Sequence, residues 1–288
     1  MAGPTTPCYN RINYMVECSL LKEIKVLVRG GGDLATGVVY RMHRAGMQVL
    51  VTELPQPTVI RRAVAFASAV LEGEVEIEGI VGRRVDFLED ALCALETAAV
   101  VPVMVDPGGE VMAKWDPDVV VDAILAKRNL GTRIDDAPTV IALGPGFEAG
   151  VDAHAVIETN RGHYLGRVIL EGRAAPDTGI PGQVMGYAQE RVLRAPRPGV
   201  FKGRKRIGDS VTAGEPVAQV DGELVVAGID GVVRGLLADG LTVTQGMKVG
   251  DVDPRGIRDH CFTISDKALA IGGGVLEAIL YLRERRLR

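Results

Sequence analysis

The chain has 288 residues, 24% of them charged, and a formal net charge of −4, so it is long enough for two domains that each bury a core. The lack of a basic excess disfavours general nucleic-acid binding, and no apolar run approaches the roughly 18 residues that a membrane span requires. The four cysteines include no C-x-x-C pair, which favours reduced thiols in a cytoplasmic protein over disulfides or a metal site.

Residues 1–23 show no sustained periodicity and are predicted to form a loose leader, in which Met15 is a candidate natural start. From residue 24 to residue 146, short apolar runs alternate with segments of helical period. This alternation predicts an α/β fold with a Rossmann-like, doubly wound parallel sheet. Ligands of such sheets bind beyond the carboxyl ends of the strands.

The first turn of this sheet carries the most informative pattern. An apolar run over residues 24–28 meets three glycines and then a helical segment, and Gly30, Gly32 and Ala35 match the fingerprint G-x-G-x-x-G/A. Such glycines let the backbone approach a pyrophosphate, and the amides that open the helix face the anion. The predicted cofactor-binding residues are Gly30, Gly31, Gly32, Asp33, Leu34, Ala35 and Thr36. The alternative is an empty unit in which the glycines only pack the helix on the sheet.

The second strand, expected over residues 47–52, is followed directly by Glu53. A carboxylate there suits a ribose 2′-hydroxyl and would repel a 2′-phosphate, so NAD or another plain-ribose ligand is preferred to NADP. Arg61 and Arg62 could weaken that preference. Loops farther along the chain open on the same edge and supply further predicted cofactor contacts: Lys127, Asn129, Gly144 and Gly146. For Lys127 the alternative is a solvated basic helix end.

Residues 147–197 are predicted to form a connecting polar segment, which holds two of the four histidines. His154 is assigned to cofactor binding, and Arg161 and His163 are catalytic candidates for proton transfer or recognition of a polar ligand. The alternative is a strand over residues 153–159 with polar residues on its solvated face. Neither H-x-x-x-H nor H-E-x-x-H occurs, so no zinc site is predicted.

Residues 198–256 repeat with an offset of 32 residues, as in Gly199-Val200 and Gly231-Val232. The duplication predicts a second, smaller β domain and resembles the biotinyl and lipoyl carrier domains, in which two half-motifs form a barrel-sandwich hybrid. Those carriers bear their cofactor on a lysine in the hairpin that joins the halves. The corresponding residues 220–224 include no lysine, and Lys248 lies in a strand. No covalent biotin or lipoate is therefore predicted, and the domain is interpreted as a docking or oligomerising platform.

Residues 257–288 are predicted to form a C-terminal helix that packs back on the first domain. Three consecutive glycines, Gly272 to Gly274, are costly inside a helix and need a reason. Either the helix begins near Gly274 with its amides facing an anion, or it presses against another backbone, which is preferred. Asp266 and Lys267 precede these glycines and are predicted to form an ion pair, with Lys267 as a further catalytic candidate.

Several segments within residues 25–280 together resemble the YqeB family of the selenium-dependent molybdenum hydroxylase system. They are RGGGDLATGVVYRMHRAGMQVLVTEL, VVVDAILAKRN, ALGPGFEAGVDAHAVIETNRGHYLGRVI, ERVLRAPRPG, VGDVDPR and ISDKALAIGGGVLEAIL. The resemblance implies an accessory protein for hydroxylase maturation, alongside XdhC-like proteins that handle the molybdenum cofactor before insertion. It transfers no catalytic residue.

The leading hypothesis is therefore a cytoplasmic accessory protein, and a homo-oligomer is compatible with it. Its ligand would bear a nucleotide, either an NAD-like dinucleotide or a molybdopterin dinucleotide, and its partner would be a molybdenum hydroxylase. A second hypothesis is an NAD-dependent oxidoreductase with His163 or Lys267 as proton donor. A third is a non-catalytic scaffold that binds the hydroxylase through the β domain and whose Rossmann unit is vestigial.

Overall fold

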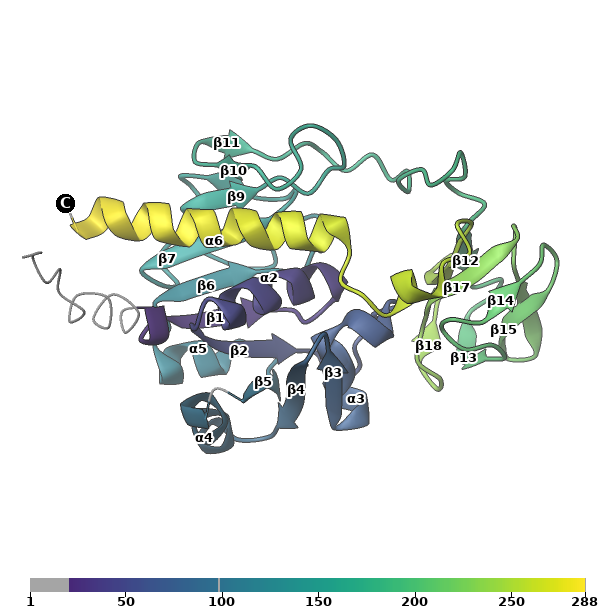
Figure 1. The fold of residues 1–288 in the computed structure, drawn as a ribbon, viewed down its shortest axis with the longest axis horizontal. Helices are drawn as coiled ribbons and strands as arrows, with labels where there is room; N and C mark the ends of the chain where they lie inside the picture. Colours follow the sequence, from purple (N-terminus) through teal and green to yellow (C-terminus); the bar gives the residue numbers. More distant parts are fainter. Residues whose placement is uncertain (1–20, 98, 288) are drawn as a thin grey trace, which may run out of the picture.

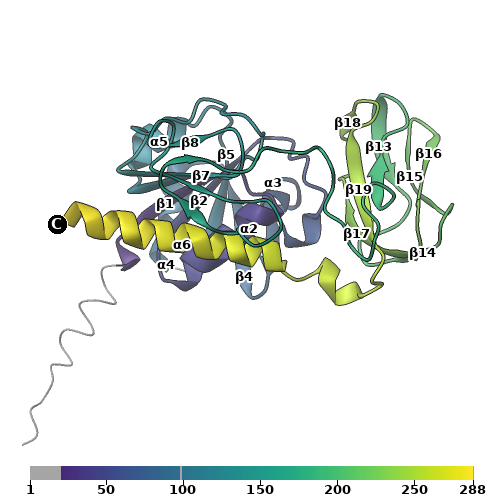
Figure 2. The ribbon, with the colours of Figure 1, turned by 90° about the horizontal axis from the view of Figure 1, so that it is seen from above.

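The computed structural model describes residues 21–97 and 99–287, so most of the predicted leader lies outside the described residues. The fold is mixed α/β. A nine-stranded sheet covered by helices forms what we call the α/β unit, and two four-stranded antiparallel sheets form the β unit (Figure 1). After the β unit the chain returns to the α/β unit, and the last helix runs along that unit (Figure 2). Among the helices of the described ranges, none has the length and apolar character needed to cross a membrane.

The large sheet has the order β10-β9-β7-β6-β1-β2-β5-β4-β3 and is parallel except at its two edge strands. Its inner strands are short apolar runs; all five residues of β7 are buried. Such continuous apolar runs are typical of parallel strands covered on both faces. The strands are β1 (Lys25–Arg29), β2 (Gln48–Glu53), β3 (Glu74–Ile77), β4 (Ile80–Val85), β5 (Val100–Val105), β6 (Val119–Asp122), β7 (Thr139–Leu143), β9 (Ala155–Ile157) and β10 (Val168–Ile169).

Helices cover both faces of this sheet, as the alternation of strands and helical segments predicts. Helices α2 (Asp33–Arg44) and α6 (Asp266–Leu287) pack on one face, and α4 (Leu88–Thr97) and α5 (Glu110–Trp115) pack on the other. The strand order reverses between β1 and β6, where the chain has run outward through β2 and β5 and then continues on the other side of β1. A crevice opens at the carboxyl ends of the strands at such a reversal.

Short elements connect these parts. Between β2 and β3 the chain forms η1 (Arg62–Val64), η2 (Phe66–Ser68) and α3 (Ala69–Glu72), and η3 (Arg258–Cys261) leads from the β unit to α6. Strands β8 (Glu148–Ala149) and β11 (Gly172–Arg173) pair with each other in a separate small sheet.

The predicted division of the chain at residues 147–197 is corrected by the strand pairing. Strands β9 and β10 belong to the large sheet, so the α/β unit continues well beyond residue 146. At the other end of the segment, β12 (Val192–Arg194) pairs with β19 and belongs to the β unit. The alternative of a strand over residues 153–159 is confirmed in part by β9, although all three of its residues are buried. Strand β10 has two residues and is too short for a periodic signal.

The duplication predicted from the sequence is visible in the backbone of the β unit. Its sheets have the orders β12-β19-β17-β14 and β16-β15-β13-β18, so each repeat places one short strand, β14 or β18, in the sheet of the other repeat. Gly199 and Gly231, which correspond in the repeat, have φ of 154° and 156°. The remaining strands are β13 (Gly199–Gly203), β14 (Ser210–Val211), β15 (Pro216–Val220), β16 (Glu223–Val226), β17 (Gly231–Leu236), β18 (Thr242–Val243) and β19 (Lys248–Asp253).

The three glycines of α6 lie inside the helix, so the predicted helix start near Gly274 is wrong and the alternative, backbone contact, is confirmed. A Cβ atom on Gly272 would lie 2.2 Å from the carbonyl oxygen of Gly37 in α2, and one on Gly274 would lie 2.1 Å from that of Gly166. A Cβ atom on Gly273 would meet nothing within 4 Å. Glycine therefore allows α6 to lie directly against two other backbones.

Candidate functional site

A cavity of about 700 Å³ lies between the two units, at the carboxyl ends of the parallel strands. The α/β unit lines it with residues that follow β1, β2, β6, β7 and β9 and with the start of α6, and the segment 175–182, which leads from β11 to the β unit, lines it as well. The β unit lines it with side chains of β17 and β19 and with two arginines at the ends of β12. The concavity thus occupies the place that a doubly wound sheet predicts for a ligand, but one of its walls comes from the β unit.

The lining of this cavity is strongly basic although the chain as a whole carries a net charge of −4. Three lining residues are acidic, namely Asp33, Asp177 and Asp251, whereas eight are basic. Concentration of positive charge in a concave site raises the local concentration of anions. The basic residues are Arg61, Lys127, Arg161, Arg191, Arg194, Arg234, Lys248 and Lys267.

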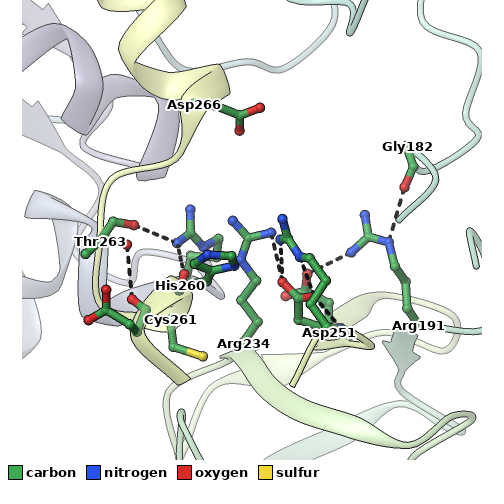
Figure 3. Close-up of polar contacts among 12 residues, drawn as sticks. Gly182, Arg191, Arg234, Asp251, His260, Cys261, Thr263 and Asp266 are labelled. Atoms are coloured by element: carbon green, nitrogen blue, oxygen red, sulfur yellow. Dashed lines mark hydrogen bonds and ion pairs between the residues drawn. The ribbon is translucent and has the colours of Figure 1, made fainter. Parts of the chain in front are cut away.

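Helix α2 begins at the wall of the cavity, where Asp33 and Leu34 line it. Gly32 precedes the helix as its N-cap and provides no side chain to occupy the first amides. The carboxylate of Asp33 lies 3.5 Å from the guanidinium of Arg61, which is only 7% exposed. Arg61 donates to the carbonyl oxygens of His260 and Thr263, each at 3.1 Å, and so joins the α/β unit to the segment before α6 (Figure 3).

The other residues of the glycine turn are packed by the chain itself. A Cβ atom on Gly30 would lie 2.9 Å from the carbonyl oxygen of Ala123, and one on Gly31 would lie 2.7 Å from the amide nitrogen of Ala67. At Gly32 the nearest atom, in Val59, is 3.7 Å away. Ala35 and Thr36 are fully buried beneath. Within the predicted run, the start of α2 faces the cavity and the turn before it is covered.

Glu53 holds the turn in place. Its carboxylate accepts hydrogen bonds from the amide of Gly31 at 2.8 Å and from that of Leu54 at 2.7 Å. Glu53 stands at the carboxyl end of β2, as predicted, but it is not among the residues that line the cavity.

The loop after β6 contributes Leu125 and Lys127, and both are non-glycine residues with positive φ, of 59° and 62°. Backbone strain of this kind concentrates at functional sites. The Lys127 ammonium donates to Asp177, another lining residue, at 2.7 Å. Asn129, also a predicted contact, instead folds its own loop by donating to the carbonyl oxygen of Thr132 and accepting from the amide of Gly131.

Gly144 and Gly146 flank Pro145, which lines the cavity, and both have positive φ. A Cβ atom on Gly144 would lie 2.5 Å from the hydroxyl oxygen of Thr159, and one on Gly146 would lie 2.6 Å from the backbone of Arg128. Close packing of the loop explains these two glycines without a ligand.

Two of the three catalytic candidates, Arg161 and Lys267, line the cavity. Arg161 donates two hydrogen bonds to Asp266, at 2.9 and 3.2 Å, and this pairing holds the pKa of Asp266 at about 2. The partner of Asp266 is therefore Arg161, which corrects the predicted ion pair with Lys267. Burial lowers the pKa of Lys267, and the neighbouring Arg161 lowers it further.

The two histidines are not brought to the cavity. His163 is exposed and packs edge-on against Tyr164, with ring centroids 5.0 Å apart. His154 immediately precedes β9 and therefore lies at the amino ends of the strands, where its Nδ1 accepts from the amide of Val140 at 3.0 Å. Burial lowers the pKa of His154, and Arg286 adds to the lowering. We therefore remove His154 from the candidate site, because it lies at the opposite edge of the sheet.

Comparison with known proteins now places the chain. No family model matches it. It is 49% identical over 263 residues to a protein of Escherichia coli strain K12 described as "Uncharacterized protein YqeB", a match that covers 91% of this chain and 48% of that protein. The chain belongs to the YqeB family. It spans about half the length of the curated relative that it matches.

Among solved structures, TcdA (CsdL) is similar to this YqeB-family chain over 96% of the chain and 93% of its own length, with 13% identity and a TM-score of 0.32. An aspartoacylase family protein of Mesorhizobium loti aligns over 80% of the chain and 84% of its own length, with 12% identity and a TM-score of 0.24. At such scores neither structure carries an argument about fold or function.

The basic residues of the β unit were missed by reasoning from the YqeB-family sequence, although the repeat contains a signal for them. At two positions of β19 the second repeat has a charged residue where the first has none: Lys248 replaces Pro216, and Asp251 replaces Gln219. Both charged residues line the cavity. No group of three or more His, Cys, Asp or Glu side chains suited to a metal ion occurs within residues 21–97 and 99–287.

Proposed function

We propose that this chain is an accessory protein for maturation of a selenium-dependent molybdenum hydroxylase and that it binds a nucleotide-bearing ligand in the cavity between its units. The observation that carries the proposal is the lining of eight basic side chains beside the open start of α2. The amides and dipole of a helix N-terminus favour phosphate, and basic side chains add charge-assisted hydrogen bonds. A dinucleotide form of the molybdenum cofactor is the ligand that the family resemblance suggests.

The strand order supports the nucleotide part of the proposal. Read from β5 through β2, β1, β6 and β7 to β9, the sheet has the order 3-2-1-4-5-6 of Rossmann dinucleotide-binding folds. A pyrophosphate would lie at Asp33 and Leu34, within reach of Arg61. Glu53 lies outside the cavity lining, so its part in the proposal is to hold the glycine turn before α2 through its bond with the amide of Gly31.

The residues of this chain would bind and orient such a ligand. Lys127, Arg161 and Lys267 form the wall of the α/β unit on which the end of the ligand remote from the ribose would rest. The molybdenum itself would be cargo, and its chemistry would belong to the hydroxylase that receives it.

An NAD-dependent oxidoreductase is a second candidate, because one observation favours it. Lys267 lines the cavity and its pKa is lowered by burial and by Arg161, so its ammonium is a better proton donor near neutral pH than an exposed lysine. His163, the other donor considered, is exposed and outside the cavity lining.

The test is a ligand panel of NAD, NADP, cytidine nucleotides and molybdopterin species, followed by thermal shift and calorimetry on the full chain. One clear responder is expected. The variant Gly32→Asp should weaken its binding at least tenfold, because the new carboxylate would repel phosphate at the start of α2. Gly273→Asp is the matched control, since Gly273 lies on α6 with nothing within 4 Å.

Three outcomes separate the hypotheses. A responder that Gly32→Asp weakens and Gly273→Asp does not supports the proposal. Reduction of NAD in the presence of a candidate substrate would move the conclusion to the oxidoreductase. No response across the panel would overturn ligand binding and leave the scaffold.

A further inference from the structure

The two sheets of the β unit are equivalent by the internal repeat, so each position in one sheet can be compared with its counterpart in the other. The 32-residue offset also relates residues 191–194 to residues 223–226, so β12 is the counterpart of β16. Pairing agrees with this: Arg194 lies opposite Lys248 in one sheet, and Val226 lies opposite Pro216 at the corresponding point of the other. One sheet lines the cavity with its side chains, and the lining includes none from the other sheet.

Where the copies differ, the sheet on the cavity carries three additional cationic side chains and one additional carboxylate, Asp251 in place of Gln219. Arg191 and Arg194 correspond to Glu223 and Val226, and Lys248 corresponds to Pro216. Folding of the repeat does not require these cations, because the copy without them forms the same strands. Arg191 is held by an ion pair with Asp251 at 2.9 Å, whereas Arg194 and Lys248 line the cavity with no carboxylate among the described residues within 4.0 Å.

The pairing of the strands also differs between the two sheets, next to Arg234. In the copy away from the cavity, β13 and β15 pair regularly, with Lys202 opposite Gln219. In the cavity copy the register between β17 and β19 shifts at Arg234, so that Gly235 is opposite Asp251. The extra residue is a β-bulge, a device that re-aims a side chain and is over-represented beside binding sites. Arg234 extends from the β unit toward the start of α6, where Asp266 lies, whereas Arg191 donates to Gly182 and Asp251 (Figure 3).

The guanidinium of Arg234 lacks a hydrogen-bond partner for one of its donors. The side chain of Arg234 is 11% exposed and lies 3.6 Å from Asp253, but its Nε has no hydrogen-bond partner within the described part of the chain. The same holds for Nε of Arg61, whose side chain is more than nine-tenths buried. Burial lowers the pKa of Arg234, and repulsion by Arg61 lowers it further. Buried donors without partners are costly, and an anion between these two arginines would relieve that cost.

Two lysines from different units line the cavity and have no ion-pair partner among the described residues. Lys248 of the β unit and Lys267 of the α/β unit both line it, and no carboxylate among the described residues lies within the 4.0 Å of an ion pair with either. Asp33 at the start of α2 acts electrostatically on both lysines. The start of α2 is therefore near both walls, and positive charge is available on each.

We propose that the β unit forms a second anion subsite, made by Arg194, Arg234 and Lys248, and that the ligand is a nucleotide with two or more phosphate groups that bridges the two units. This inference rests on the proposed nucleotide binding and extends it, because it assigns half of the site to the repeated domain. A ligand with one phosphate occupies only the start of α2. A ligand with a second anionic group reaches the wall of the β unit.

The test uses cytidine monophosphate and cytidine triphosphate as probes, with calorimetry on the full chain. The variants are Lys248→Gln and Arg194→Val, and the second introduces the residue found at the equivalent position of the other repeat. Each should weaken binding of the triphosphate about tenfold and change binding of the monophosphate less than about twofold. Lys248→Arg should retain triphosphate affinity, because the charge is kept. Lys202→Gln, at the position of Arg234 in the other sheet, is the matched control and should change neither probe.

The outcomes distinguish this inference from the function on which it rests. If both probes bind the wild-type chain and Lys248→Gln weakens them equally or not at all, the second subsite is overturned and nucleotide binding stands. If neither probe binds the wild-type chain, the second subsite is overturned, and nucleotide binding is then decided by the panel of NAD, NADP and molybdopterin species. Thermal unfolding of every variant shows whether it is folded, and Lys248→Arg provides a folded variant even if Arg194→Val is not.

Discussion

Helices α2 and α6 begin at the same edge of the sheet and lie side by side (Figures 1 and 2). Each is associated with three consecutive glycines, before α2 and within α6. In each triplet two glycines press against another backbone, Gly30 and Gly31 in the first and Gly272 and Gly274 in the second, and the remaining one is open. A run of glycines thus indicates close approach of backbone in both places, but only the open glycine before α2 is followed directly by residues that line the cavity, Asp33 and Leu34.

The first turns of the two helices also match. Asp33 opens α2 and pairs with Arg61 at 3.5 Å, whereas Asp266 opens α6 and receives two shorter hydrogen bonds from Arg161. The carboxylate in the first turn of α6 is thus engaged by two short hydrogen bonds from an arginine, whereas the carboxylate in the first turn of α2 has one longer contact with its arginine. The difference favours α2 as the helix whose amides meet a ligand.

The largest effect is expected from Gly272→Ala. The new methyl group would lie 2.2 Å from the carbonyl oxygen of Gly37, so α6 must move away from α2, at about 3 kcal/mol of unfolding free energy. Urea unfolding measures the loss. Gly273→Ala is the control on the same helix and should leave stability unchanged or raise it by up to about 1 kcal/mol, because alanine is the better helix former. Equal losses for the two variants would show that α6 does not contact α2 as described.

Gly31→Ala should lower the free energy of unfolding by about 2 kcal/mol. Its methyl group would lie 2.7 Å from the amide nitrogen of Ala67, and displacement of the turn would weaken the bond from Gly31 to Glu53. Thermal unfolding is the measurement, and a midpoint equal to that of the wild type would refute the packing role of this glycine.

Gly32→Ala should lower the free energy of unfolding by less than about 1 kcal/mol. The atom nearest to the new methyl group is 3.7 Å away, so the main loss is that alanine is a poorer N-cap than glycine. Comparison with Gly31→Ala by the same thermal unfolding separates the packed turn from the open start of α2. A loss as large as that of Gly31→Ala would mean that both positions are packed.

The smallest effect concerns Asp266. Because its pKa is lowered to about 2, the ion pair with Arg161 contributes stability above the ordinary carboxyl pKa near 3.9, and the contribution is lost as pH falls toward 2. The pair is largely exposed, so the contribution is less than about 1 kcal/mol. Arg161→Gln should raise the pKa of Asp266 toward its ordinary value in an NMR titration, and an unchanged value would exclude Arg161 as the cause.

The sequence predicted those features that depend on neighbours along the chain. The turn at Gly30 and the strand ending at Glu53 are set by local pattern, and the duplication of the β unit is set by glycines at matching positions. Their agreement with the structure follows because turns and strands of these kinds need particular residues at fixed spacings.

The site was harder to predict because it depends on residues far apart in the sequence. Arg61 reaches carbonyl groups about 200 positions away, and Lys248 meets the cavity only because the β unit lies against the ends of the strands. His154 was misplaced for a simpler reason. It stands before a parallel strand, at the edge of the sheet opposite the cavity, whereas Arg161 follows that strand and lines the cavity.

The β unit is inserted between β11 and α6, so the last helix of the α/β unit is made after the whole β unit. Until then the face of the sheet that Ala268, Ile271 and Val275 cover has no partner there. During synthesis the β unit can therefore close on its own strands first, while the α/β unit must wait for α6. A chain stopped after β19 would leave that apolar face exposed and prone to aggregation.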